Sequence, residues 1–115
     1  MTLTTGVISD RRAHERRPFR TEALLTFADG QSRVAHVLDI GKGGVGLITD
    51  INAPLGYPFK ITLRLPGAGT GGVPFEAHGS VANCILDGRR GGFRWGAQFK
   101  DLTPAALAAL KGIGA

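Results

Sequence analysis

The sequence predicts an all-β fold, a six-stranded antiparallel barrel with one short C-terminal helix. Of its 115 residues, 18 are glycine and 6 are proline, so turns are frequent. Hydrophobic residues make up 43% and charged residues 20%, the balance of a folded domain rather than a disordered chain. Several apolar runs also alternate with the period of two that is typical of strands. Together these observations favour a small barrel over a helical bundle.

Six segments carry the strand pattern, and the clearest is 59–65, where apolar and polar residues alternate strictly. The expected strands are 22–27, 33–40, 45–49, 59–65, 73–86 and 93–99. Asp29-Gly30 and the segment 87–92 are expected to form turns. In the long fifth strand, we expect Gly79 to make a bulge or a bend, because glycine often marks such positions.

The end of the chain has the signals of a short helix. Thr103 is a good N-cap, Pro104 suits the first helical position, and Gly112 stops the alanine- and leucine-rich run between them. We therefore expect a flexible lead-in over 1–10 and a single domain over 11–115. Within that domain we expect an arginine arm at 11–20, the barrel at 21–100 and the helix at 103–112.

Positive charge is concentrated before the first strand. Lys and Arg outnumber Asp and Glu by 14 to 9, and the pI is about 10.2. Five arginines fall within one ten-residue block: Arg11, Arg12, Arg16, Arg17 and Arg20. Guanidinium offers a planar fork for phosphate and for the edge of guanine, and Pro18 favours an extended arm. The block therefore indicates an anion-binding arm, although a solvated basic tail has the same charge pattern.

The sequence shows no sign of a catalytic or metal centre. Its 3 histidines are scattered, away from cysteines or carboxylates at metal-ligand spacing. Cys84 is the single cysteine and is interpreted as an inert structural thiol in a strand, with no internal disulfide. No secretory signal opens the chain, and no apolar stretch approaches the roughly 20 residues of a membrane span. We expect a cytoplasmic, non-enzymatic protein without metal or membrane insertion.

A second motif lies between the second and third expected strands, at residues 39–46 (Asp-Ile-Gly-Lys-Gly-Gly-Val-Gly). Such a turn exposes backbone N–H groups and lets a ligand come close, since glycine has no Cβ. Asp39 can accept hydrogen bonds from the N1–H and N2–H₂ edge of guanine. A plain β-turn capped by an aspartate is the alternative. A Walker phosphate-binding loop is excluded, because no Gly-Lys-Ser/Thr opens a helix here.

The order and spacing of the two motifs resemble the PilZ family of cyclic di-GMP receptors over about residues 10–110. The resemblance rests on the RxxxR arm, on the later D-x-x-x-x-G, and on Trp-Gly-Ala-Gln-Phe at 95–99, which resembles the closing strand of the family. It implies a PilZ-type β-barrel in bacterial second-messenger signalling. The ligand-binding residues that it implies are Arg11, Arg12, Arg16, Asp39, Gly41 and Gly44.

The resemblance also implies roles for these residues. Arg12 and Arg16 match the two arginines that contact the phosphates and the Hoogsteen edges of guanine, while Asp39 opens the second motif and Gly44 closes it. An arginine at the position of Arg11 goes with an intercalated pair of ligand molecules. Ligand binding then orders the arm, and the change is passed to an unidentified downstream protein by contact.

One position departs from the family motif. The family has Asp/Asn-x-Ser-x-x-Gly, and Gly41 stands where the serine belongs. A serine hydroxyl contributes about 0.5–1.5 kcal/mol per hydrogen bond, so its loss weakens binding without abolishing it. The departure favours one alternative, an adaptor with a degenerate pocket that acts only through protein contacts. A second alternative, a nucleic-acid-binding barrel, rests on the pI but lacks exposed aromatic residues for base stacking, so we expect no nucleic-acid partner.

Overall fold

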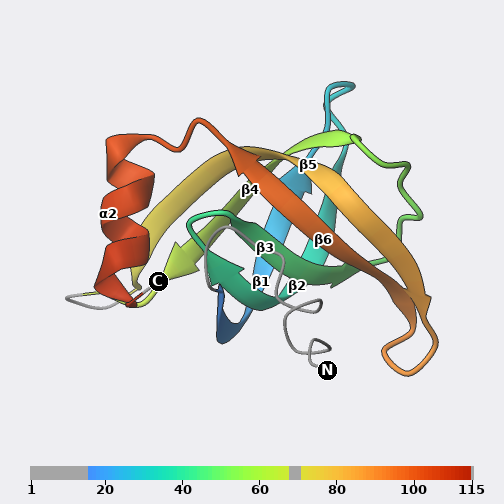
Figure 1. Cartoon of the computed structure of the whole chain (residues 1–115), viewed down its shortest axis with the longest axis horizontal. Coiled ribbons are helices and arrows are strands. Elements are labelled where there is room, and N and C mark those ends of the chain that lie inside the picture. Colours follow the sequence, from blue (N-terminus) through green and yellow to red (C-terminus); the bar gives the residue numbers. More distant parts are fainter. Residues whose placement is uncertain (1–15, 68–70, 115) are drawn as a thin grey trace, which may run out of the picture.

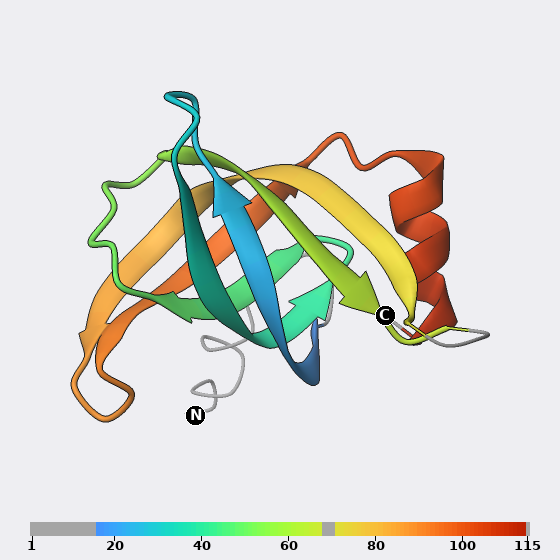
Figure 2. The same ribbon diagram turned by 180° about the vertical axis from the view of Figure 1, so that it is seen from behind.

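A computed structural model describes residues 16–67 and 71–114. Six antiparallel strands form a closed barrel in the order β1-β2-β3-β6-β5-β4, and a helix packs against β5 at one end (Figures 1 and 2). The elements are β1 (Arg16–Thr26), β2 (Ser32–Gly41), β3 (Gly44–Thr49), β4 (Pro58–Leu65), β5 (Val73–Asp87), β6 (Gly92–Lys100) and α2 (Pro104–Gly112). The predicted fold class is confirmed.

The core lies inside the barrel, where the inward-facing residues of all six strands meet. Trp95 of β6 is fully buried and packs its ring on Phe59, with centroids 5.7 Å apart. Its indole Nε1 donates a 2.9 Å hydrogen bond to the carbonyl oxygen of Ile51. Because a buried indole N–H needs an acceptor, this bond fixes the loop after β3 against the core.

The first strand begins six residues earlier than the run at 22–27 indicates. Arg16 pairs with Gly41 and Arg17 with Ile40, so the backbone from Arg16 onward belongs to the sheet. The register of this pairing shifts between Pro18 and Thr21, and Phe19 within the shift packs against the core. The second half of the expected arm is therefore strand, and its position is set by the end of β2.

The prediction of a bulge or bend at Gly79 is wrong. Gly79 pairs regularly with Phe59 on β4 and Phe99 on β6. A Cβ there would lie 2.7 Å from the carbonyl oxygen of Gln98 and 3.0 Å from Cζ of Phe59. The glycine thus makes room for a close approach inside the barrel, and the bulge of β5 lies further along, between Val81 and Asn83.

The C-terminal helix follows its predicted signals. Thr103 Oγ1 accepts a 3.1 Å hydrogen bond from the backbone N–H of Ala106, and Pro104 is the first helical residue. Ala106, Ala109 and Leu110 are buried against the barrel. The helix includes Gly112 rather than stopping before it, and its cap is Ile113.

Candidate functional site

Two β-bulges decide which way the polar residues of the site face. The register shifts in β2 between Val37 and Asp39, and in β5 between Val81 and Asn83. Both valines point into the core and are at most 2% exposed. In a regular strand, residues two apart share a face, so Asp39 and Asn83 would also point inward. The extra residue in each bulge turns both polar side chains to the outer face.

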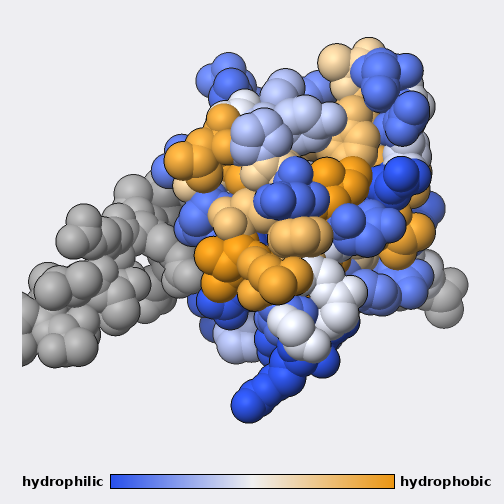
Figure 3. Space-filling model, turned by 90° about the vertical axis from the view of Figure 1, so that its right-hand side faces the viewer, coloured by the Kyte–Doolittle hydropathy of each residue, from blue (hydrophilic) through white to orange (hydrophobic). Residues whose placement is uncertain are grey.

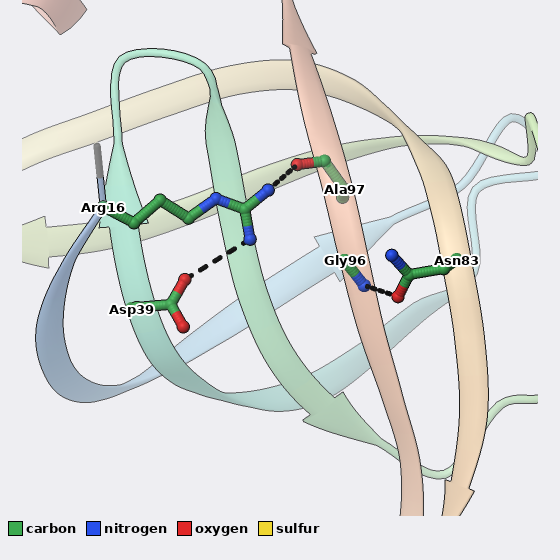
Figure 4. Close-up of polar contacts among 5 residues, drawn as sticks. All are labelled: Arg16, Asp39, Asn83, Gly96 and Ala97. Atoms are coloured by element: carbon green, nitrogen blue, oxygen red, sulfur yellow. Dashed lines mark hydrogen bonds and ion pairs between the residues drawn. The ribbon is translucent and has the colours of Figure 1, made fainter. Parts of the chain in front are cut away.

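Asp39 and Asn83 lie at the two ends of one row that crosses four strands. The register pairs Asp39 with Gly46 and Asn83 with Gly96, and the two glycines pair with each other. We call these four residues the glycine row. Figure 4 shows the carboxylate and the amide pointing toward one another along it.

The two glycines of the row leave the space that the polar groups occupy. A Cβ on Gly46 would stand 2.9 Å from both carboxylate oxygens of Asp39. A Cβ on Gly96 would stand 2.8 Å from Nδ2 of Asn83, whose Oδ1 accepts a 3.1 Å hydrogen bond from the Gly96 N–H. The described part of the chain gives Nδ2 no acceptor. The row therefore presents a carboxylate and an amide donor, each lying close over a glycine of the sheet.

Arg16 reaches over this surface from the start of β1. Its Nη1 lies 3.4 Å from Oδ1 of Asp39, and its Nη2 donates to the Ala97 carbonyl oxygen at 3.3 Å (Figure 4). The arginine side chain is only 10% exposed and the carboxylate side chain 30%. Strong charge-assisted hydrogen bonds measure about 2.7–2.9 Å, so neither of these two contacts is a strong one.

The glycines of the second motif lie directly beside Arg16. Gly41 is the partner of Arg16 in the β1–β2 register, and it is buried at the end of β2. Gly44 opens β3, and a Cβ there would collide with the Ala97 carbonyl oxygen and lie 3.0 Å from Nη2 of Arg16. Gly44 thus allows β3 and β6 to approach closely while the guanidinium passes over them.

The structure brings together four of the six residues expected to bind the ligand: Arg16, Asp39, Gly41 and Gly44. Arg11 and Arg12 lie outside the described residues. Sequence reasoning missed the rest of the row, Gly46, Gly96 and Asn83. Gly46 lies within the 39–46 motif and pairs with Asp39 across the β2–β3 hairpin. Gly96 and Asn83 join the row only through the pairing of β3 with β6 and of β6 with β5, and no local signal marks that register.

A hollow of about 500 Å³ lies beside the row on the outer face of β1, β2 and β3, and Arg20, His36 and Ile48 are among its lining residues. Another hollow, of about 630 Å³, lies between β4, β5 and the start of α2. Two of its charged residues have partners, since Arg64 donates to the Gly71 carbonyl oxygen at 3.3 Å and Glu76 pairs with Lys60 at 3.7 Å. The first hollow is the better extension of a binding surface, because β2 and β3 line it and also carry Asp39 and Gly46.

Within the described ranges, no group of three or more His, Cys, Asp or Glu side chains could hold a metal ion. Cys84 is half-buried, and its Sγ lies 3.6 Å from Oδ1 of Asn52. None of the helices in residues 16–67 and 71–114 is long and apolar enough to cross a membrane.

The chain is a small closed antiparallel β-barrel domain that carries a charged row over two glycines on its outer face. The family model for the PilZ domain matches residues 10–113, so the chain belongs to the PilZ domain family. No curated protein sequence shows a significant match.

Two solved structures resemble the fold. The PilZ domain with c-di-GMP of YcgR from Escherichia coli is 19% identical with a TM-score of 0.65, over 90% of this chain and 88% of that one. The Bacillus subtilis inhibitor of motility, MotI/DgrA, is 15% identical with a TM-score of 0.74, over 91% of this chain and 50% of that one. The chain therefore spans about half the length of MotI. At these identities the likeness shows the shared fold.

Proposed function

We propose that this chain is a receptor domain that binds cyclic di-GMP over the glycine row and signals through protein contacts. PilZ proteins bind this nucleotide as a ligand rather than as a cofactor. The observation that carries the proposal is the arrangement of Arg16 over Asp39 and the glycine row, with a cation and a carboxylate on one flat backbone surface.

The two ends of the row complement the two ends of the guanine edge. The Asp39 carboxylate can accept from N1–H and N2–H₂, while Nδ2 of Asn83 is a donor without a partner among the described residues. The two glycines let both polar groups lie close to the sheet, so that a planar base can approach them without meeting a Cβ. Such a pair favours guanine over adenine, because adenine has no N1–H to donate to the carboxylate.

Arg16 supplies the phosphate contact in this proposal. Its contacts with Asp39 and Ala97 are longer than strong hydrogen bonds, so exchanging one of them for a phosphate oxygen costs little. Arg11 and Arg12 bring further positive charge from the same arm. Family membership suggests which groups of the ligand these arginines contact. It also suggests that an intercalated pair of ligand molecules binds at Arg11. Ordering of the arm then changes the surface that a partner protein contacts.

Calorimetry with cyclic di-GMP tests the proposal. We expect a dissociation constant in the low micromolar range or tighter, which weakens as salt rises because the contacts are ionic. The stoichiometry distinguishes a single ligand from an intercalated pair. The ligand should also raise the midpoint of thermal unfolding. At a free ligand concentration ~100 times the dissociation constant, binding adds about 2.7 kcal/mol to the free energy of unfolding. Cyclic di-AMP is the control, with the same phosphates and no guanine edge. An unchanged unfolding midpoint with cyclic di-GMP would favour the non-binding adaptor.

Gly41 is the one position that favours the adaptor, and its replacement by serine separates the two functions. Gly41 pairs with Arg16 and stands two residues after Asp39 in the same strand, so we expect a serine hydroxyl there to reach the ligand. Gly41→Ser should then tighten cyclic di-GMP binding by about 2- to 13-fold, the equivalent of one hydrogen bond. Gly43→Ser, in the adjoining turn, is the matched control and should leave the affinity unchanged. Equal effects of both serines in calorimetry would show that position 41 does not face the ligand.

A further inference from the structure

The hairpin formed by β5 and β6 extends past the rest of the barrel at one end. β4 pairs with β5 only from Val73 to Ser80, and β3 pairs with β6 only as far as Phe93. The part of β5 from Asn83 to Asp87 is therefore strand-paired to β6 alone. Figure 1 shows the hairpin turn at the lower right of the molecule. We call residues 85–94 the hairpin tip.

The hairpin tip exposes two large apolar side chains in succession. Ile85 is 52% exposed and Leu86 is 72% exposed. Since neighbours in a strand point to opposite faces, each face of the ribbon carries one of them. Figure 3 looks onto this end of the molecule, and orange apolar atoms gather there above the blue polar ones of the turn. A lone exposed leucine is ordinary, whereas two large aliphatic side chains exposed in succession leave both faces of the ribbon with apolar surface that a partner could cover.

The charge around this pair is positive. Arg94 lies opposite Ile85 in the register, and Arg89 and Arg90 form the turn. Asp87 is committed to Arg90, accepting from its backbone N–H at 3.1 Å and from Nη1 at 2.9 Å. The bond from that backbone N–H, with the guanidinium beside it, holds the pKa of Asp87 below its usual value of 3.8. In the described part of the chain, Arg89 and Arg94 have no acidic partner.

We infer that the hairpin tip is a docking site for a protein partner that presents acidic residues next to apolar ones. Arg89 and Arg94 pair with the acidic groups, and Ile85 and Leu86 enter the apolar part of the cleft. Charge complementarity identifies this occupant, since Arg89 and Arg94 have no acidic partner among residues 16–67 and 71–114 and an aliphatic residue stands on each face. None of the four residues of the glycine row belongs to the hairpin tip, so the two surfaces can be altered separately by substitution.

A bilayer or a nucleic acid fits these residues less well. Arg89 and Arg90 lie beyond the aliphatic pair at the end of the hairpin, so tip-first insertion would carry guanidinium groups into the acyl region before any apolar side chain. A phosphate backbone would use the arginines but leave Ile85 and Leu86 without apolar contacts. A protein cleft with acidic and apolar walls satisfies both kinds of side chain.

A phage library of random dodecapeptides, panned on the immobilised full chain without nucleotide, tests the inference. We expect enriched peptides in which Asp or Glu alternates with Leu or Phe. Fluorescence anisotropy measures the affinity for the best peptide. The double variants I85S/L86S and R89E/R94E should each bind it about tenfold or more weakly, the loss expected at the centre of an interface. Replacing its acids by lysine should restore binding to R89E/R94E, which links the affinity to the charges of the tip.

Leu107→Ser is the matched control, because Leu107 is 40% exposed and lies on α2, away from the tip. This variant should leave the affinity for the peptide unchanged. All of the replaced residues are exposed, and circular dichroism checks that each variant is folded. Three outcomes would overturn the inference. They are peptides without acids, peptide binding that the tip variants do not change, and tip-dependent binding to phosphatidylglycerol vesicles or to a DNA duplex with none to the peptides. Because nucleotide is omitted, failure here leaves the proposed receptor function standing.

Discussion

Replacement of Arg16 by alanine is expected to weaken cyclic di-GMP binding by about 100-fold or more. The guanidinium lies over the glycine row, where it contacts Asp39 and the Ala97 carbonyl oxygen. A hydrogen bond to a charged group contributes about 1.5–3 kcal/mol, so losing the phosphate contact at the upper end of this range gives a loss of this size. Arg16→Lys keeps the charge but lacks the planar fork, so its affinity should lie between those of the unaltered protein and Arg16→Ala. Calorimetry at one fixed salt concentration measures the affinity of the unaltered protein and of both variants for cyclic di-GMP.

Arg17→Ala is the matched control for this experiment. It removes the same charge from the next residue, whose guanidinium lies beside the end of α2, 3.6 Å from where a Cβ of Gly114 would stand. Its loss should change the affinity only by the small effect of net charge, about threefold or less at physiological salt. If Arg16→Ala binds as well as Arg17→Ala does, the ligand does not lie over the glycine row.

The second large effect is expected at Gly44, where an alanine should destabilise the fold and weaken ligand binding together. Its Cβ would collide with the Ala97 carbonyl oxygen, a backbone atom that moves only if β3 and β6 separate. Overpacking of this kind costs about 1–3 kcal/mol or more. The same Cβ would lie 3.0 Å from Nη2 of Arg16, which must also shift. Urea unfolding measures the first effect and calorimetry the second.

Two other glycines separate these effects. Gly88→Ala adds a Cβ with nothing within 4 Å and should leave both stability and affinity nearly unchanged. Gly46→Ala meets only the flexible carboxylate of Asp39, at 2.9 Å. It should therefore weaken binding with a smaller loss of stability than Gly44→Ala. A Gly44→Ala protein as stable as the Gly88→Ala protein would show that β3 and β6 tolerate wider spacing than the structure has.

Most of the fold could be predicted from local patterns. The alternation at 59–65, the turn at Asp29-Gly30 and the cap at Thr103 each depend on a few neighbouring residues, and all three agree with the structure. The start of β1 could not be predicted in this way. Residues 16–20 have no alternating apolar pattern, and they are strand because the end of β2 offers them partners. Gly79 was misjudged because a glycine that admits a close neighbour and one that marks a bulge look alike in a sequence.

The site was predictable only where its residues belong to a short motif. Asp39, Gly41 and Gly44 stand within six positions of each other, so spacing alone brings them together. Asn83 and Gly96 join them through register, which depends on pairing between strands far apart in the chain. Asn83 has no sequence feature that distinguishes it from any other polar strand residue.

The bulges before Asp39 and Asn83 have a consequence for how this surface diverges among related proteins. The direction of each polar side chain depends on the count of residues in its strand, since one residue fewer would return the strand to regular alternation and turn the polar group toward the core. An insertion or deletion of a single codon at either place would therefore change the face that Asp39 or Asn83 occupies while leaving the residue itself unchanged. An alignment that ignores such a gap would place non-equivalent residues in the same column and miss the change.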